Sequence, residues 1–180
     1  MMIKLSKIFL LGLLLSVPVA QADSAAPDIN AAPALSVSEL GAADVVMETL
    51  SLIGTPYRWA GAYPEGGLDC SGLVSYVYRD VLAKDLPHSA EALFSSAGGK
   101  RIDKSELQPG DLVFFHMGHH HRRIDHVAVY IGEGRFVHAP TTGSTVRVDN
   151  LDNGFWREHY RGAVRLIPGD VALRDLPPHS

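Results

Sequence analysis

The 180-residue sequence contains a single cysteine, Cys70. An internal disulfide is therefore excluded, and no other cysteine is available to carry a lipid anchor. Clusters of basic residues are missing too, because the 16 Lys and Arg are scattered among 20 Asp and Glu and leave a net charge of −4. Binding to a phosphate backbone needs a clustered cationic surface, so no nucleic-acid partner is expected.

The N-terminal apolar run, Ile8 to Val17, is shorter than the roughly 20 residues that a membrane-spanning helix needs. Two lysines precede the run and an Ala-x-Ala site follows it, which predicts a secretory signal peptide over residues 1–22. A membrane anchor is the alternative. We expect an exported, soluble mature protein, in the periplasm or outside the cell, with no membrane anchor after cleavage.

The length favours one compact domain, and the sequence has no internal repeat. Residues 23–37, rich in Ala, Pro and Ser, predict a flexible leader. Residues 169–180, which include two adjacent prolines, predict a C-terminal tail. The folded domain is therefore expected over residues 38–168.

Hydrophobic periodicity changes along this domain from helical to alternating. Helical spacing predicts three helices, over 38–53, 70–82 and 89–96. Alternation predicts five strands, over 111–115, 126–131, 135–138, 145–148 and 161–166. Helices followed by strands indicate an α+β fold with an antiparallel sheet.

Cys70 follows a Gly-rich loop and opens the second predicted helix. Unpaired backbone N–H groups and the helix dipole favour a thiolate there, which predicts a pKa near or below neutral in place of about 8.5. A structural cysteine is expected further inside the helix, on the apolar face of Leu73, Val74 and Val77. The position therefore favours a nucleophile over a buried structural residue.

A thiolate nucleophile needs an imidazole beside it and a third group that orients this imidazole. Of the nine histidines, His126 opens one predicted strand and His138 closes the next. By itself, a histidine on an otherwise apolar strand is more often a hydrogen-bonded core residue than a catalytic one. A two-residue turn at Glu133-Gly134 would place the two rings on opposite faces of the hairpin. A catalytic pairing therefore requires an odd loop or a bulge, which Gly132-Glu133-Gly134 permits.

Several ordered motifs resemble the NlpC-type cell-wall cysteine peptidases, a bacterial branch of the papain-like fold. The motifs are Gly54 to Gly61, Asp69 to Val74, Leu107 to Phe115, His126 to Gly132 and Phe136 to Ala139. The match runs from about Val45 to Leu166. It implies a papain-like domain with N-terminal helices packed on a central antiparallel sheet of about five to six strands.

The resemblance implies Cys70 as nucleophile, His126 as general base and acid, and His138 as the residue that accepts the Nδ1 proton of His126. The Tyr57 hydroxyl would stabilise the oxyanion together with the backbone N–H of Cys70. A packing role is the alternative for Tyr57.

Asp69 and Ser71 flank the nucleophile and are the candidate substrate-binding residues. Asp69 would pair with an ammonium group of the substrate or cap the helix. The implied activity is hydrolysis of peptidoglycan stem peptides in cell-wall remodelling or turnover. The expected bond joins the γ-carboxyl of D-glutamate to a diamino acid such as meso-diaminopimelate. No metal or other cofactor is expected, and targeting would come from the domain itself or from a partner protein.

Two segments depart from the family pattern: the His-rich insert Met117 to Arg123, and Pro87-His88-Ser89, where many members have Arg after the Pro. The insert raises an alternative function, an exported metal-binding protein that uses His116 to His121. Adjacent histidines rarely all point at one ion, and Arg122-Arg123 repels cations. The other alternative is a catalytically silent wall-binding module that retains the fold.

Overall fold

The computed structural model describes residues 37–118 and 123–167, which contain four α-helices. These are α1 (Val37–Ser51), α2 (Cys70–Leu82), α3 (Ala90–Ser96) and α4 (Gly154–His159). The first three lie where helices are predicted, and α4 was not predicted. The predicted signal peptide, the leader up to residue 36 and the C-terminal tail lie outside the described residues.

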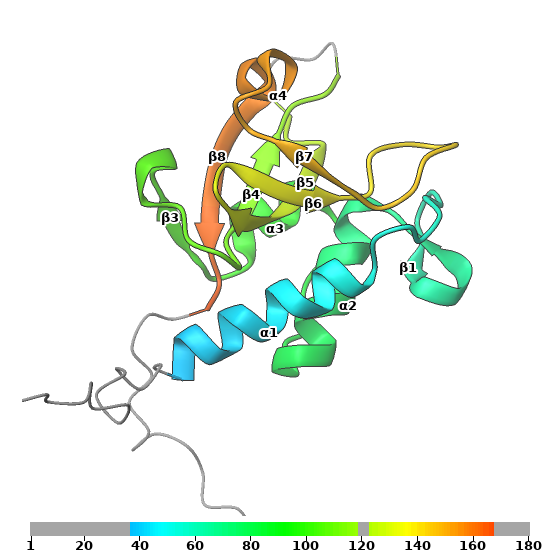
Figure 1. Cartoon of the computed structure of the whole chain (residues 1–180), viewed down its shortest axis with the longest axis horizontal. Helices are drawn as coiled ribbons and strands as arrows, with labels where there is room; N and C mark the ends of the chain where they lie inside the picture. The colour runs from blue at the N-terminus through cyan, green and yellow to red at the C-terminus, as the bar shows by residue number, and fades with distance from the viewer. Residues whose placement is uncertain (1–36, 119–122, 168–180) are drawn as a thin grey trace, which may run out of the picture. The chain divides into compact units, whose positions relative to one another are not determined.

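The main sheet has six antiparallel strands in the order β3-β8-β4-β5-β6-β7 (Figure 1). Their bounds are β3 Lys100–Ile102, β4 Leu112–Phe115, β5 His126–Gly132, β6 Arg135–His138, β7 Arg147–Asn150 and β8 Tyr160–Arg165. A separate hairpin of β1 (Ala62–Tyr63) and β2 (Gly67–Leu68) precedes α2. The predicted α+β class with an antiparallel sheet of five to six strands is confirmed.

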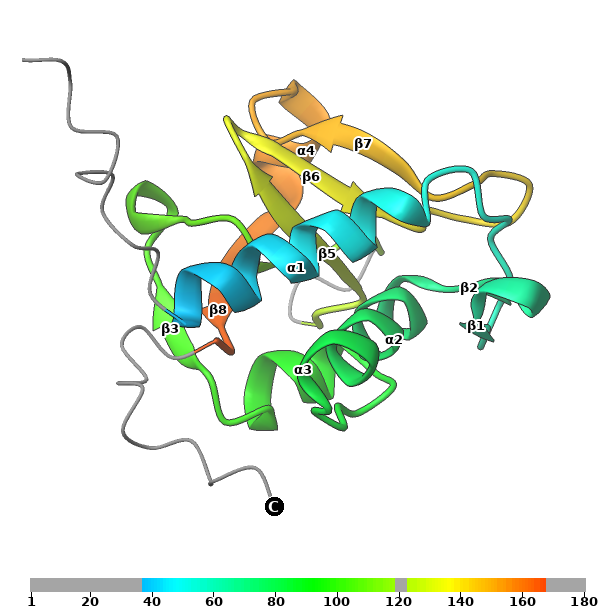
Figure 2. The same ribbon diagram turned by 60° about the horizontal axis from the view of Figure 1, so that its bottom comes forward.

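The two faces of the sheet bury different clusters of side chains, because alternate residues of each strand point to opposite sides. Val127 and Val129 belong to the cluster that includes the buried residues of α1 and α2. Ala128 and Tyr130 belong to the second cluster, with Trp156 of α4. Figures 1 and 2 show α1 and α2 running beside each other.

Helix α2 begins at Cys70 because Asp69 caps it, accepting a hydrogen bond from the Gly72 N–H at 2.7 Å. The first turn of α2 also lies directly against the preceding loop. A Cβ atom on Gly72 would lie 1.9 Å from the carbonyl oxygen of Gly61, so only glycine fits at this contact. The Asp-Cys-Ser-Gly sequence thus fixes the start of the helix and its distance from the loop.

The hairpin between β5 and β6 contains the bulge that a pairing of the two strand histidines requires. Tyr130 pairs with Phe136 whereas Gly132 pairs with Arg135, so one extra residue lies on the β5 side. Glu133 closes the turn with φ +53°, between glycines at +99° and +72°. This shift places the side chains of residues 126 and 138 on the same face of the sheet.

Strand β7 differs from its predicted position by two residues, because 145–148 was predicted and Arg147–Asn150 is observed. The residues before Arg147 pair with a different segment. Val146 exchanges backbone hydrogen bonds of 2.8 and 2.9 Å with Thr55 and Gly54, in the loop after α1. This long-range pairing brings Asp149 into the strand. Strand β3 was also not predicted.

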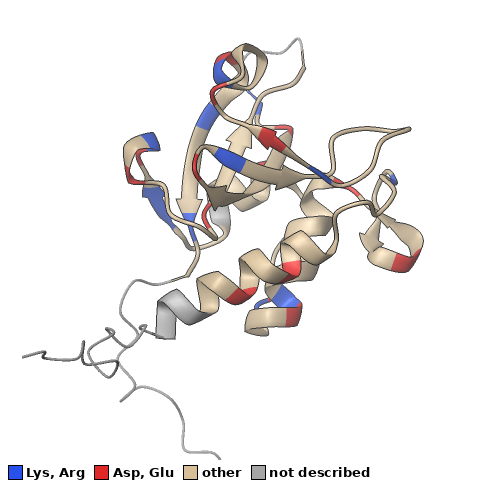
Figure 3. Ribbon diagram, viewed as in Figure 1, with Lys and Arg blue, Asp and Glu red and all other residues tan. Residues whose placement is uncertain are grey.

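Basic and acidic residues are interspersed over the described part of the chain (Figure 3). No helix within residues 37–118 and 123–167 combines the length and the apolarity that a membrane crossing requires.

Candidate active site

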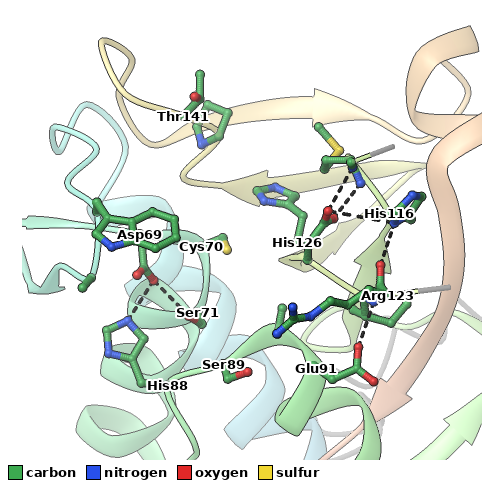
Figure 4. Close-up of a pocket in the computed structure, with 18 of the residues that line it drawn as sticks. Asp69, Cys70, Ser71, His88, Ser89, Glu91, His116, Arg123, His126 and Thr141 are labelled. Carbon is green, nitrogen blue, oxygen red and sulfur yellow. Dashed lines mark hydrogen bonds and ion pairs between the residues drawn. The ribbon is translucent and has the colours of Figure 1, made fainter. Parts of the chain in front are cut away.

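A pocket of about 830 Å³ lies where the N-terminus of α2 meets the start of β5. Its lining includes Cys70, His126, Tyr57, Asp69 and Ser71. Figure 4 shows the Cys70 sulfur pointing across the pocket toward the ring of His126. The fold therefore brings five of the six predicted site residues to one cavity, and it places the sixth, His138, directly behind His126.

Cys70 is partly exposed, and its sulfur accepts a hydrogen bond from the backbone N–H of Val127 in β5. Burial raises the pKa of the Cys70 thiol to about 11, and Asp69 adds to this rise. The backbone N–H groups of Val127, Ser71 and Cys70 itself act in the opposite direction without reversing it. The prediction of a lowered pKa for Cys70 was therefore wrong. The position of Cys70 at the start of a helix can be read from the sequence, and so can the favourable dipole there, but the burial of the sulfur cannot. The Cys70 thiol is therefore neutral at physiological pH.

His126 and His138 form a buried, directly bonded pair. His126 Nε2 lies 2.8 Å from His138 Nδ1, and the rings meet edge to face. The predicted bond used the other nitrogen of His126. With Nε2 engaged by His138, Nδ1 is the ring nitrogen left for the side of Cys70.

Trp156 of α4 covers this histidine pair. Its indole stacks on the His126 ring at 5.8 Å between centroids and contacts the His138 ring edge to face at 4.8 Å. Burial, with the neighbouring His138, lowers the pKa of His126 to about 3. Burial also lowers the pKa of His138 to about 4, although Asp149 acts against this shift. Both imidazoles are therefore neutral at physiological pH.

Tyr57 lies in the loop between α1 and β1, where its backbone N–H donates to the Ser144 carbonyl at 2.8 Å. Burial raises the pKa of its hydroxyl, and the nearby Cys70 and Asp69 add to the rise. The hydroxyl therefore stays protonated and can donate a hydrogen bond into the pocket.

Asp69 has the capping role that was the alternative to substrate binding. Its Oδ1 also accepts the Ser71 hydroxyl at 3.0 Å and lies 2.9 Å from His88 Nε2 (Figure 4). Ser71 is buried. Both residues line the pocket, so the network presents a carboxylate beside Cys70.

The opposite wall of the pocket comes from the ends of the His-rich insert. His116 Nδ1 donates to the Arg123 carbonyl at 2.6 Å, and Asp125 accepts two backbone N–H groups from Met117 and Gly118. His119 to His121, central to the alternative metal site, lie outside the described residues. Residues 37–118 and 123–167 contain no group of three side chains able to hold a metal ion.

Comparison with known proteins identifies the domain. The model of the NlpC/P60 family matches residues 54–165. The chain belongs to the NlpC/P60 family. All the motifs that suggested the resemblance, from Gly54 to Ala139, lie within this match, and the proposed resemblance is confirmed.

Curated NlpC/P60 relatives align with about two thirds of the chain. "Probable endopeptidase YafL" of Escherichia coli K12 is 40% identical over 122 residues, which cover 67% of this chain and 48% of the relative. "Murein DD-endopeptidase MepH" of the same strain is 42% identical over 115 residues, 64% of this chain and 42% of the relative. "Bifunctional muramidase/DL-endopeptidase CwlT" of Bacillus subtilis is 36% identical over 115 residues, 64% of this chain and 33% of the relative. The chain thus spans less than half the length of these relatives.

A crystal structure of an NlpC/P60 family protein from Bacillus cereus superimposes with a TM-score of 0.64 and 34% identity. The superposition covers 71% of this chain and 40% of that one. It agrees with the α+β architecture described above.

Two side chains of this NlpC/P60 site were missed in the sequence. Trp156 lies in the unpredicted helix α4, where the run Gly154 to His159 is too short to show a helical period. Asp149 lay beyond the end of the predicted strand. The Asn153 side chain, which accepts from the Phe155 N–H and caps α4, was the available signal for the helix.

Proposed function

We propose that this protein is a cysteine endopeptidase that hydrolyses peptidoglycan stem peptides at the bond between the γ-carboxyl of D-glutamate and the diamino acid. The observation that carries the proposal is the arrangement of Cys70, His126 and His138. The sulfur faces the His126 ring, and His126 Nε2 lies 2.8 Å from Nδ1 of His138 behind it. Family membership and the endopeptidase names of the relatives support the reaction class.

Acylation starts from a neutral thiol and a neutral imidazole. Nδ1 of His126 takes the thiol proton as the Cys70 sulfur attacks the scissile carbonyl carbon, so that proton removal and S–C bond formation proceed together. The C–N bond then breaks, and the imidazolium of His126 gives its proton to the leaving amine. Water hydrolyses the thioester with His126 again as base.

The oxyanion formed in both steps has two proposed donors, the Tyr57 hydroxyl and the backbone N–H of Cys70. A donor at this position is worth about 3 kcal/mol in the transition state. Asp69 and Ser71 are the proposed substrate contacts, since a carboxylate in the pocket suits an ammonium group of the diamino acid or of a free peptide N-terminus.

The bond itself is tested with purified muropeptides and mass spectrometry. Cleavage of an uncrosslinked disaccharide tetrapeptide into a disaccharide dipeptide and a free dipeptide is expected. Release of two intact monomers from a crosslinked dimer, with no cleavage of the monomer, would instead indicate the DD bond that the name of MepH specifies. A Cys70→Ala variant is the control. Absence of any product with the wild-type protein would favour a silent wall-binding module.

We also infer that the protein acts after export, in the periplasm or outside the cell, on the basis of the residue pattern over 1–22. N-terminal sequencing of protein recovered from the exported fraction should begin at Asp23. A chain recovered with Met1 at its N-terminus would contradict export by cleavage.

A further inference from the structure

His138 has a second polar partner on the side away from His126. Its Nε2 lies 2.8 Å from Oδ2 of Asp149, and its side chain is fully buried. Both ring nitrogens of His138 are therefore engaged, one by His126 and one by Asp149. Asp149 is 27% exposed at its side chain and is not among the residues that line the pocket.

The register of two neighbouring strands produces this contact. His138 of β6 pairs with Arg147 of β7, and Phe136 pairs with Asp149. Residues two apart on a strand share a face, so Asp149 lies diagonally across from His138 on the same side of the sheet. Arg147 lies on that side too, and its Nε and Nη2 donate to the same Oδ2 at 3.2 and 3.1 Å.

These contacts determine which nitrogen carries each proton. An ionised carboxylate only accepts hydrogen bonds, so Nε2 of His138 must donate to Asp149. A neutral imidazole has one N–H, and Nδ1 of His138 is therefore an acceptor. It takes the Nε2 proton of His126, which leaves Nδ1 of His126 as a free acceptor toward Cys70.

Without the carboxylate, the opposite arrangement of protons becomes available. Nδ1 of His138 can then donate to Nε2 of His126, whose own proton moves to Nδ1. In that arrangement His126 faces the thiol with an N–H and cannot act as a base. The two arrangements contain the same number of hydrogen bonds between the rings, so the partner of His138 Nε2 selects between them.

We propose that Asp149 is a positioning residue of this active site, which acts through His138 to hold His126 in the tautomer that can deprotonate Cys70. Arg147 holds the carboxylate in place through two hydrogen bonds to the same oxygen. The inference rests on the proposed function for its kinetic consequence, whereas the proton positions can be observed without a substrate.

The first test observes the tautomers directly, by ¹H–¹⁵N NMR of the uniformly labelled protein at pH 7.5. In the wild type, both His126 and His138 should carry their proton on Nε2. In Asp149→Ala, a substantial fraction of both rings should carry it on Nδ1. If both rings remain protonated on Nε2 in Asp149→Ala, Asp149 does not select the tautomer and the proposal is wrong.

The second test measures turnover of a muropeptide. Asp149→Ala should lower kcat ten- to a hundredfold, as loss of a partner that orients an active-site histidine does, with KM within twofold. Asp149→Asn should retain more activity than Asp149→Ala, because the amide oxygen can still accept from His138. The control variant is Asp152→Ala. Asp152 is an exposed carboxylate 3.7 Å from Lys104, and its replacement should leave kcat unchanged.

A double-mutant cycle shows whether Asp149 acts through His138. In a His138→Ala background, Asp149→Ala should lower kcat less than threefold further. An equal loss in both backgrounds would mean that Asp149 acts by another route, and the proposal would fail. If the wild-type protein cleaves no muropeptide, the proposed function fails, and the NMR measurement alone decides the role of Asp149.

Discussion

The buried histidine pair should make the protein lose stability steeply on mild acidification. The pKa values of His126 and His138 are lowered to about 3 and about 4 in the folded protein. In the unfolded chain both return to about 6.5. Between pH 6.5 and pH 4 the unfolded state therefore binds more protons than the folded state, and the free energy of unfolding falls as the pH falls. The contribution is fully present above pH 6.5.

The size of this loss of stability follows from the difference between the folded and unfolded pKa values. Each imidazole that stays neutral in the fold lowers the free energy of unfolding by about 2 kcal/mol between pH 7 and pH 5, so the pair contributes about 4 kcal/mol. This is a large share of the 5–15 kcal/mol typical of a domain. His138→Gln removes one titrating group, and its loss over the same range should be smaller than that of the wild type by about 2 kcal/mol.

Urea unfolding followed by far-UV circular dichroism at several pH values between 5 and 7.5 measures this difference. The free energy of unfolding is plotted against pH for the wild type and for His138→Gln. The difference between the two slopes cancels the contributions of all other titrating groups. His159→Gln controls for the loss of a histidine outside the buried pair. Parallel curves for the wild type and His138→Gln, within about 0.5 kcal/mol, would refute the conclusion that the pair is buried neutral.

Four other predictions concern the site and its support. Cys70→Ala should abolish hydrolysis while the melting temperature changes little, and residual turnover would exclude the thiol as nucleophile. Gly72→Ala should destabilise the fold by roughly 1–3 kcal/mol in urea unfolding, because the added Cβ meets a backbone oxygen that cannot move aside freely. In kcat/KM the expected order is wild type, His138→Gln, His138→Ala, His126→Ala, and an inverted order of the two alanine variants would exchange their roles. Replacing His119 to His121 by Ser should leave kcat nearly unchanged and chelators should not inhibit, whereas a loss restored by zinc would favour the metal-binding alternative.

The parts of the fold that local sequence determines were predicted well. The capping Asp69 and the apolar face of α2 lie within a few residues of each other, so the start of this helix is readable from the sequence. An odd loop or a bulge near Glu133 was predicted as the condition for His126 and His138 to share a face, and the structure has the bulge.

The errors concern features that depend on distant segments. The pKa of Cys70 is set by burial against β5, which no property of the α2 sequence reveals. The bounds of β7 depend on the pairing of Val146 with Thr55, about ninety residues apart. Asp149 was missed for the same reason, since its meeting with His138 needs the exact partner of each β6 residue.

The extra residue in the β5–β6 hairpin has a consequence for how this domain can vary between related sequences. Surface turns usually tolerate insertions and deletions. Here a one-residue deletion near Glu133 would remove the bulge. The side chain of His138 would then point to the face of the sheet that packs against α1 and α2, away from His126. A change of two residues would preserve the alternation. Length variation in this turn should therefore occur in even steps among active proteins, although the turn contains no proposed catalytic residue.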